Sequence, residues 1–247
     1  MDYQDYLQHK EGGSRHFWFR AKKNLIRELL TAVYPDGKKD RLILDVGAGA
    51  GFELGALLPF GRVIALDKND QALRVAAETG CETIKGDAQK MEWPEDHYDC
   101  VCCFDVLEHI SDDRGLLDKI FHSLKRSGFF IFTVPAHPVL YGPHDLALEH
   151  ARRYEKKDIL NKLKKAGFSV VRIGYWNSLL FLPEALFRII KKILFNPAKA
   201  KKLVPETKPP LGFINDLLFC VLDTENRLVK KKLAMPLGLT IYGITKK

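Results

Sequence analysis

The feature that most constrains the fold is a glycine-rich turn between a short apolar run and a helical pattern. Gly47, Gly49 and Gly51 follow residues 41–46, whose composition is typical of a buried strand. Glycine has no Cβ, so the backbone can turn tightly here and approach a ligand closely. The amides that begin the next helix can bind an anionic group. The sequence therefore predicts a ligand-binding strand–turn–helix unit.

Short apolar runs alternate with helical patterns along most of the chain. We expect further strands at 62–66, 82–84, 98–104, 129–134, 169–175 and 239–245, and helices at 51–58, 70–79, 112–125 and 156–166. This alternation indicates a mostly parallel sheet with helices on both faces. A chain of 247 residues suffices for one such domain. We therefore expect residues 1–247 to form a single α/β domain.

The segment between the last two expected strands has a different pattern. Residues 177–235 are predicted to be a helical insertion, and residues 1–36 an N-terminal cap and helix. Within the insertion, a basic linker with prolines at 198–210 separates two helices. The first helix has an apolar stripe, with Arg188, Lys191 and Lys192 lying off it. The stripe consists of Leu186, Ile189, Ile190, Ile193 and Leu194.

Charge is divided unevenly along the chain. Residues 1–150 contain 18 Lys and Arg against 24 Asp and Glu, whereas residues 151–247 contain 21 against 7. This excess favours an anionic partner for the C-terminal part, although lysines in water are the alternative. A basic amphipathic helix can bind an anionic membrane surface or a lipid-linked substrate. Equally, its stripe can pack on the domain core, and both interpretations stay open here.

Carboxylates follow several of the expected strands. Asp67 ends the second strand, where it can accept hydrogen bonds from ribose hydroxyls. Residues 86–88 (Gly-Asp-Ala) follow the third strand, and their carboxylate can accept a hydrogen bond from an adenine amino group. Residues 104–109 (Phe-Asp-Val-Leu-Glu-His) end the fourth strand. Because the carboxyl ends of parallel strands border one ligand crevice, we expect these groups to meet there.

In order and spacing, these motifs resemble class I S-adenosylmethionine-dependent methyltransferases over about residues 40–175. More narrowly, they are similar to the small-molecule group that includes the ubiquinone-biosynthesis O-methyltransferases. The resemblance implies a Rossmann-like, doubly wound sheet of seven strands in the order 3-2-1-4-5-7-6, with strand 7 antiparallel. Small members usually join strands 6 and 7 by a short hairpin, whereas this chain has the helical insertion. The resemblance implies methyl transfer from S-adenosyl-L-methionine, which leaves S-adenosyl-L-homocysteine.

The resemblance also implies which residues bind the cofactor. The methionine part would contact Asp45, Gly47, Ala48 and Gly49, the ribose Asp67 and Lys68, and the adenine Asp87 and Ala88, with Phe104 and Asp105 as the floor. Residues 16–20 (His-Phe-Trp-Phe-Arg) resemble a segment of one bacterial and archaeal branch that packs over the cofactor, with Arg20 near its carboxylate. Packing in the core is the alternative for these aromatic residues.

An acceptor hydroxyl must lose its proton, and histidine is suited to that role near pH 7. His109 and His144 are the candidate catalytic residues, and His137 and His150 lie on the same loop as His144. A structural or solvated role is the alternative for each of them. Arg152 and Arg153 are candidates for binding an anionic acceptor, or are surface arginines.

We expect a small-molecule or glycan/lipid-linked acceptor, methylated at O or N. A nicotinamide-dependent oxidoreductase is disfavoured because its fingerprint is Gly-x-Gly-x-x-Gly, whereas Gly47, Gly49 and Gly51 alternate here. A nucleic-acid methyltransferase is an alternative, motivated by the basic C-terminal part. No Asn-Pro-Pro-aromatic motif follows the fourth strand, so we expect no nucleic-acid partner. A non-catalytic S-adenosylmethionine-binding module is another alternative.

Composition places the chain in a reducing compartment. Three of its five cysteines crowd residues 100–103, which suits neither a disulfide framework nor a zinc site, and we expect no bound metal. The N-terminus has no apolar signal pattern, and no run of 18 apolar residues occurs. We therefore expect a cytoplasmic protein, with peripheral contact to an anionic membrane as a further hypothesis. The sequence indicates no oligomeric state.

Overall fold

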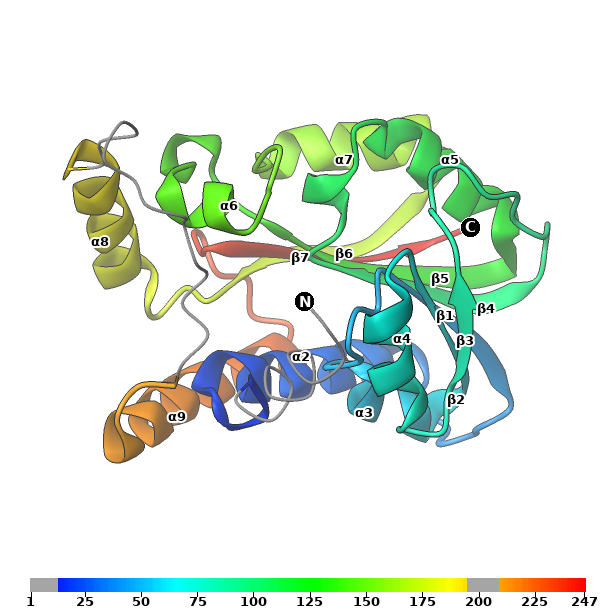
Figure 1. Ribbon diagram of the computed structural model, residues 1–247, viewed down its shortest axis with the longest axis horizontal. Coiled ribbons are helices and arrows are strands. Elements are labelled where there is room, and N and C mark those ends of the chain that lie inside the picture. Colours follow the sequence, from blue (N-terminus) through cyan, green and yellow to red (C-terminus); the bar gives the residue numbers. More distant parts are fainter. Residues whose placement is uncertain (1–12, 195–208) are drawn as a thin grey trace.

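A seven-stranded sheet in the order β3-β2-β1-β4-β5-β7-β6 forms the centre of the molecule (Figure 1). The structure is a computed structural model that describes residues 13–194 and 209–247. The strands are β1 (Arg41–Val46), β2 (Gly61–Asp67), β3 (Glu82–Lys85), β4 (Tyr98–Phe104), β5 (Leu124–Pro135), β6 (Ser169–Trp176) and β7 (Thr240–Lys246). β7 is antiparallel to both of its neighbours, and the other pairs are parallel. The predicted fold class, strand order and direction are confirmed.

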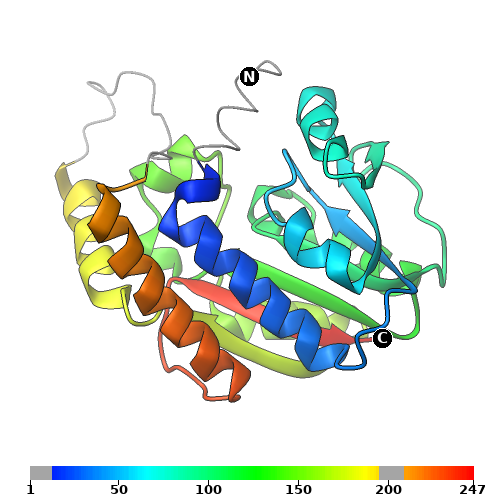
Figure 2. The same ribbon diagram turned by 90° about the horizontal axis from the view of Figure 1, so that it is seen from below.

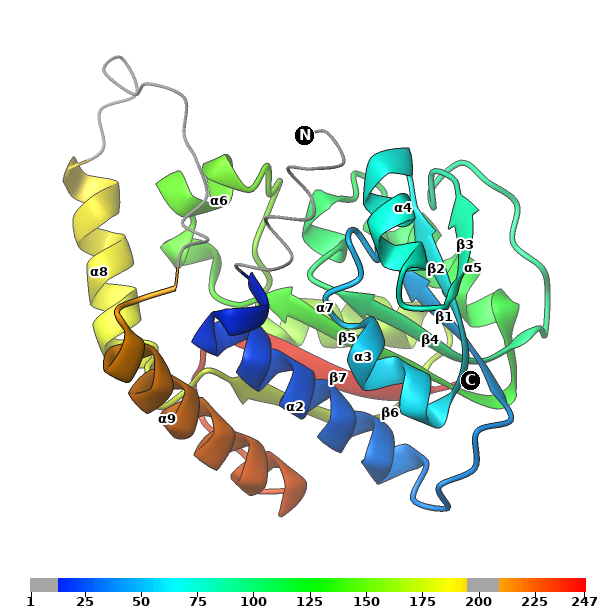
Figure 3. The same cartoon turned by 60° about the horizontal axis from the view of Figure 1, so that its bottom comes forward.

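Helices cover both faces of the sheet (Figures 1 and 3). One face packs against α2 (Phe17–Val33), α3 (Leu54–Leu57), α4 (Asp70–Ala77) and α9 (Gly212–Lys230). The other face packs against α5 (Asp113–Ser123) and α7 (Lys156–Lys165). Beyond the carboxyl ends of the strands lie the short helix α6 (Pro143–Ala147), α8 (Phe181–Leu194) and the 3-10 turns η2 (Leu107–His109) and η3 (Pro138–Leu140). A third 3-10 turn, η1 (Leu58–Phe60), follows α3.

The strands form because both of their faces are buried. In β4, Val101 and Cys103 face the layer of α5 and α7, while Cys100 and Cys102 face the layer of α2. All four side chains are fully buried, and the cysteines are free thiols that fill the core as small apolar groups. A parallel sheet covered on both faces requires such continuous apolar runs.

Several predicted boundaries differ from the structure, and two of the differences have a clear physical cause. The helix expected at 51–58 begins only at Leu54, because the glycine turn continues through residues 51–53. The helix expected at 112–125 ends at Ser123, because Leu124 is extended and buried and already belongs to β5. α5 therefore ends where the following apolar side chain, Leu124, becomes part of the sheet.

The insertion is fastened to the domain mainly through α9, which lies beside α2 (Figure 2). Asn215 accepts a hydrogen bond from the Phe17 amide at 2.9 Å and donates one to the Arg15 carbonyl at 2.9 Å. Glu225 accepts hydrogen bonds from the amides of residues 178 and 179, in the turn before α8. Most of the predicted linker 198–210, and residues 1–12, lie outside the described residues. The division of the chain at residues 36, 177 and 235 stays a prediction.

Within residues 13–194 and 209–247, no helix has both the length and the apolar character needed to cross a bilayer.

Asn226 is expected to be a main contributor to the joint between α9 and α2. Its side chain accepts a hydrogen bond from the buried Trp176 indole at 2.9 Å and donates one to the Ala21 carbonyl at 2.9 Å. Asn226→Ala leaves both groups buried without a partner, so we expect the free energy of unfolding to fall by about 2–4 kcal/mol. Urea denaturation measures this change. The control is Thr224→Ala, because Thr224 is exposed and bonds only within α9. An equal loss in both variants would contradict the role given to Asn226.

Candidate active site

The glycine turn after β1 has three residues in the left-handed region, with φ of +70° at Gly47, +52° at Gly49 and +78° at Gly51. A Cβ on Gly47 would lie 2.5 Å from Val106, and one on Gly51 would lie 2.6 Å from Leu54. A Cβ on Gly49 would meet nothing within 4 Å. Two of the glycines therefore allow close packing, while Gly49 borders open space at the carboxyl edge of the sheet.

Asp67 connects the end of β2 to this turn. Its Oδ2 accepts a hydrogen bond from the Gly49 amide at 2.9 Å, and its Oδ1 accepts one from the Asn69 amide at 2.8 Å. The carboxylate is half-buried, and the neighbouring Lys68 is exposed. A carboxylate held beside open space in this way can accept further hydrogen bonds from ligand hydroxyls.

The turn after β3 places Asp87 and Ala88 next to two large side chains. The Trp93 indole donates a hydrogen bond to the Ala88 carbonyl at 3.1 Å, and Met91 packs against the turn. Asp87 accepts a hydrogen bond from the backbone amide two residues later, and its side chain is 35% exposed. The turn thus combines an accessible acceptor with an apolar surround, as the adenine assignment requires.

A buried ammonium group lies at the same edge, and the sequence analysis missed it. Lys22 of α2 is 3% exposed, and its Nζ lies 2.7 Å from Asp105 Oδ2 and 2.9 Å from Glu53 Oε1. Burial alone would lower the pKa of Lys22, but the two carboxylates raise it above its usual value. Burial likewise would raise the pKa of Asp105, but the charge of Lys22 and its hydrogen bond lower it. The signal that could have revealed this group was a lysine at a buried position of the α2 pattern.

Asp105 is also held in an unusual backbone conformation, with φ of +56°. Its Oδ1 accepts a hydrogen bond from the Thr133 hydroxyl at 2.9 Å. Strained residues of this kind persist where their surroundings fix them, and they concentrate at functional sites. At the end of β1, burial first and the charge of Glu53 second raise the pKa of Asp45 well above its usual range. Such a carboxyl gains stability when a cationic ligand arrives.

His109, Glu108 and His150 form a compact group beyond β4. One ligand atom from each lies within 4.8 Å of the others, and the two imidazole rings are 4.8 Å apart. Glu108 is fully buried, and neither of its carboxylate oxygens has a hydrogen-bond partner. Burial raises the pKa of Glu108 well above its usual range, and the charge of Asp105 adds to this. The group has the chemistry to share a proton or to hold a divalent cation, so the expected absence of a metal is untested.

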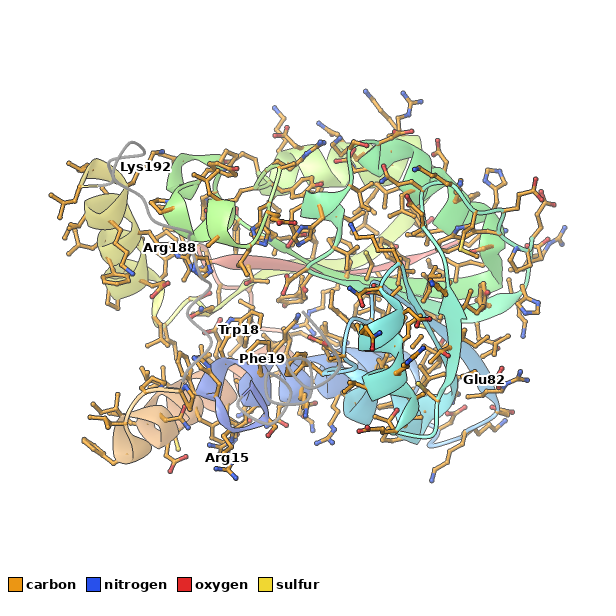
Figure 4. The ribbon with its side chains drawn as sticks, in the orientation of Figure 1. Arg15, Trp18, Phe19, Glu82, Arg188 and Lys192 are labelled. Atoms are coloured by element: carbon orange, nitrogen blue, oxygen red, sulfur yellow. The ribbon has the colours of Figure 1, made fainter. Side chains whose placement is uncertain are left out.

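His144 lies on α6, next to Asp145, which bonds His150 of that group at 3.1 Å. Burial first and the charge of Arg188 second lower the pKa of His144 to about 4, so its imidazole is neutral near pH 7. Burial also lowers the pKa of His109. Figure 4 shows Arg188 pointing from α8 toward the body of the molecule. The two candidate bases are therefore both neutral near pH 7.

Arg20 does not reach the glycine turn. Its guanidinium lies 2.7 Å from Asp216 and 4.0 Å from the centre of the Phe219 ring, both on α9. Figure 4 shows the neighbouring Phe19 rising from α2 toward the site, where it stacks on Phe52 with ring centres 4.8 Å apart. The structure therefore supports contact between the glycine turn and this aromatic segment, and gives no support to Arg20 as a partner of the cofactor carboxylate.

Arg152 and Arg153 are structural links. Arg153 is buried and donates hydrogen bonds to Asp145 at 2.8 Å and to the Ala136 carbonyl at 3.0 Å. Arg152 lies 3.3 Å from Asp113, near the start of α5. The Arg153 guanidinium is therefore committed to these contacts, whereas the Arg152 side chain is 35% exposed and its role in anion binding stays a prediction.

Comparisons with known proteins agree with this geometry. A family model described as "Methyltransferase domain" matches residues 44–132. An uncharacterized methyltransferase, YcgJ, of Bacillus subtilis is 30% identical over 114 residues, which are 42% of this chain and 45% of that protein. A ubiquinone biosynthesis O-methyltransferase of Shewanella sp. is 30% identical over 105 residues, covering 39% of this chain and 43% of that protein. The chain spans less than half the length of these curated relatives.

Solved structures share the fold over most of the chain. An S-adenosylmethionine-dependent methyltransferase of Archaeoglobus fulgidus aligns with a TM-score of 0.57 and 19% identity, covering 91% of this chain and 94% of the other. Phosphoethanolamine N-methyltransferase 2 of Haemonchus contortus, in complex with S-adenosyl-L-methionine, aligns with a TM-score of 0.61 and 18% identity, covering 100% and 60%. The sheet order, the ordered motifs along its edge and the family match over residues 44–132 together make this chain similar to the class I S-adenosylmethionine-dependent methyltransferases.

Proposed function

We propose that the chain binds S-adenosylmethionine at the carboxyl edge of β1, β2 and β4 and transfers its methyl group to an acceptor. The observation that carries this proposal is the open space at Gly49 beside the fixed carboxylate of Asp67. When bound, the cofactor supplies a methyl group already activated on a sulfonium, so alignment and exclusion of water provide much of the rate. The acceptor is a small molecule or a glycan/lipid-linked molecule, methylated at O or N. Both kinds of acceptor atom occur among the named relatives.

The residues at this edge fit the parts of that cofactor. The methionine part would lie against Asp45, Gly47, Ala48 and Gly49, the ribose against Asp67 and Lys68, and the adenine against Asp87 and Ala88, with Phe104 and Asp105 beneath. Asp45 is suited to an ammonium group because its carboxyl is buried and near another acid. Lys22 lowers the pKa of Asp105 and forms ion pairs with both Asp105 and Glu53, which hold these carboxylates in place.

The acceptor would bind beyond β5 and β6, beneath α8. Four side chains there have buried polar atoms without a hydrogen-bond partner: His137, Asn177, Ser178 and Arg188. The His137 ring lies 5.3 Å from the Phe181 ring, at the start of α8. Buried polar groups in folded proteins normally have partners, so these atoms are suited to a polar ligand. Labelled methyl transfer from S-adenosylmethionine into a cell extract, followed by partition into lipid and water phases, identifies the acceptor class.

An acceptor hydroxyl would lose its proton to His109 or His144, both of which are neutral near pH 7 because of their lowered pKa. If the group of Glu108, His109 and His150 instead holds a divalent cation, the cation would lower the pKa of the acceptor hydroxyl. A chelator distinguishes the two, because it abolishes methyl transfer only in the second case.

Replacing Gly49 or Gly47 by alanine is expected to have different effects on cofactor affinity and on stability. Gly49→Ala places a methyl group in the open space, so we expect the affinity for S-adenosylmethionine to fall at least about tenfold. Its free energy of unfolding should fall by only about 1–2 kcal/mol, because alanine disfavours a positive φ. Gly47→Ala adds a collision with Val106, so its stability should fall by about 2–4 kcal/mol.

Calorimetric titration and urea denaturation of both variants measure these effects. Unchanged cofactor affinity in Gly49→Ala would contradict the proposed site, whatever the stability of the variant.

His144 should make the protein sensitive to acid. Its folded pKa of about 4 lies below the ordinary value of 6.5, so the unfolded chain binds more protons between these two pH values. The stability contributed by neutral His144 is complete above the unfolded pKa and is lost as the pH falls toward 4. We expect His144→Gln to lose less stability than the wild type over this range, measured by urea denaturation at a series of pH values. His122→Gln is the control, because His122 is exposed. Parallel pH curves for wild type and His144→Gln would refute the assignment.

A further inference from the structure

The outer surfaces of α8 and of the first turns of α9 consist largely of exposed apolar side chains. Leu211 is 82% exposed, Phe213 78%, Leu194 77% and Ile193 76%. The same surface includes Leu182, Leu186, Phe187, Ile189, Ile190, Ile214 and Leu217, and we call the whole set the α8–α9 apolar surface. Large exposed apolar areas are uncommon on soluble monomers and mark interaction sites.

The predicted stripe of α8 takes part in this surface and does not pack on the core. All five of its residues are between 41% and 77% exposed, and Ala185 is the buried residue of the helix. The alternative in which the stripe covers the domain core is therefore wrong. Figures 1 and 3 show α8 and α9 at the end of the molecule away from β3. The apolar side chains thus face outward at one end of the fold.

Positive charge accompanies this surface. Lys191 and Lys192 are exposed on α8, next to Ile193 and Leu194. On the helices themselves, Glu184 is paired with Arg188 and Asp216 with Arg20, so these acids already have basic partners. Apolar side chains flanked by lysines are the pattern of helices that lie in the interface of anionic bilayers.

We propose that the α8–α9 apolar surface docks on an anionic lipid bilayer, with its apolar side chains among the acyl chains and its lysines at the headgroups. A second copy of this chain fits less well, because a two-fold contact through this surface would bring like charges together. Each lysine near the surface contributes about 1 kcal/mol. Docking would also bring the edge beneath α8, where the acceptor is proposed to bind, to the membrane. The bilayer contact itself does not require methyl transfer.

Co-sedimentation of the full chain with vesicles tests the proposal. We expect binding to vesicles of phosphatidylcholine mixed with phosphatidylglycerol, little binding to phosphatidylcholine alone, and weaker binding at high salt. The double variant Ile193→Glu/Phe213→Glu should lose binding, because it places carboxylates in the apolar surface. Lys191→Gln and Lys192→Gln should each weaken binding about fivefold.

Leu233→Glu is the matched control, because Leu233 is 50% exposed but lies beyond the opposite end of α9. It should bind vesicles as the wild type does. Unchanged affinity of the double variant for S-adenosylmethionine would show that its loss of vesicle binding comes from the surface and not from misfolding. Absence of binding to mixed vesicles, or equal binding to both compositions, would overturn the proposal. So would self-association of the wild type that the double variant abolishes, because the surface would then be a dimer interface.

Discussion

The buried ammonium of Lys22 joins three segments at the carboxyl edge of the sheet, two of which carry carboxylates that would otherwise repel each other. It bridges α2 to Glu53 behind the glycine turn and to Asp105 at the end of β4. Breaking a buried pair of this kind leaves an uncompensated charge, at a typical cost of about 3–5 kcal/mol. Lys22 ties α2 to the site beside the strained backbone of Asp105, and it lies between two carboxylates. Because Asp45 and Asp67 add further acid, the edge carries more carboxyl groups than cations, which suits a cationic ligand such as a sulfonium.

The insertion is connected to this edge by two contacts of different character. α9 is fixed to the domain by hydrogen bonds from three of its side chains. Asn215 bonds the backbone of α2, and Glu225 bonds the backbone of the turn before α8. Asn226 bonds both the backbone of α2 and the indole of Trp176. α8 has little buried surface of its own and reaches the domain through Arg188, Phe181 and Ala185. One helix therefore anchors the insertion, while the other covers the proposed acceptor side and turns apolar side chains outward.

The local pattern of apolar, polar and glycine residues was sufficient to predict most strands and helices of the fold. The bounds of β1 and β4 follow from continuous apolar runs between polar positions, and the glycine turn and Asp67 were recognisable from their spacing. The strand order came from the family resemblance, because periodicity alone cannot order strands. Contacts between residues far apart in the sequence could not be predicted from local pattern. Lys22 contacts Asp105, and Asn226 contacts Ala21, only once the chain has folded. Periodicity also could not decide which partner the α8 stripe meets, because an amphipathic helix has the same pattern beside a core or beside a membrane.

We propose that one cofactor binds along the carboxyl edge of the sheet, in contact with the turns after β1, β2, β3 and β4. Amide hydrogen exchange of the full chain, with and without S-adenosyl-L-homocysteine, tests it directly. We expect slower exchange at residues 47–53, 67–69, 87–89 and 104–106, with α7 and the C-terminal half of α9 unchanged. Protection confined to other segments, or no protection at saturating ligand, would contradict it.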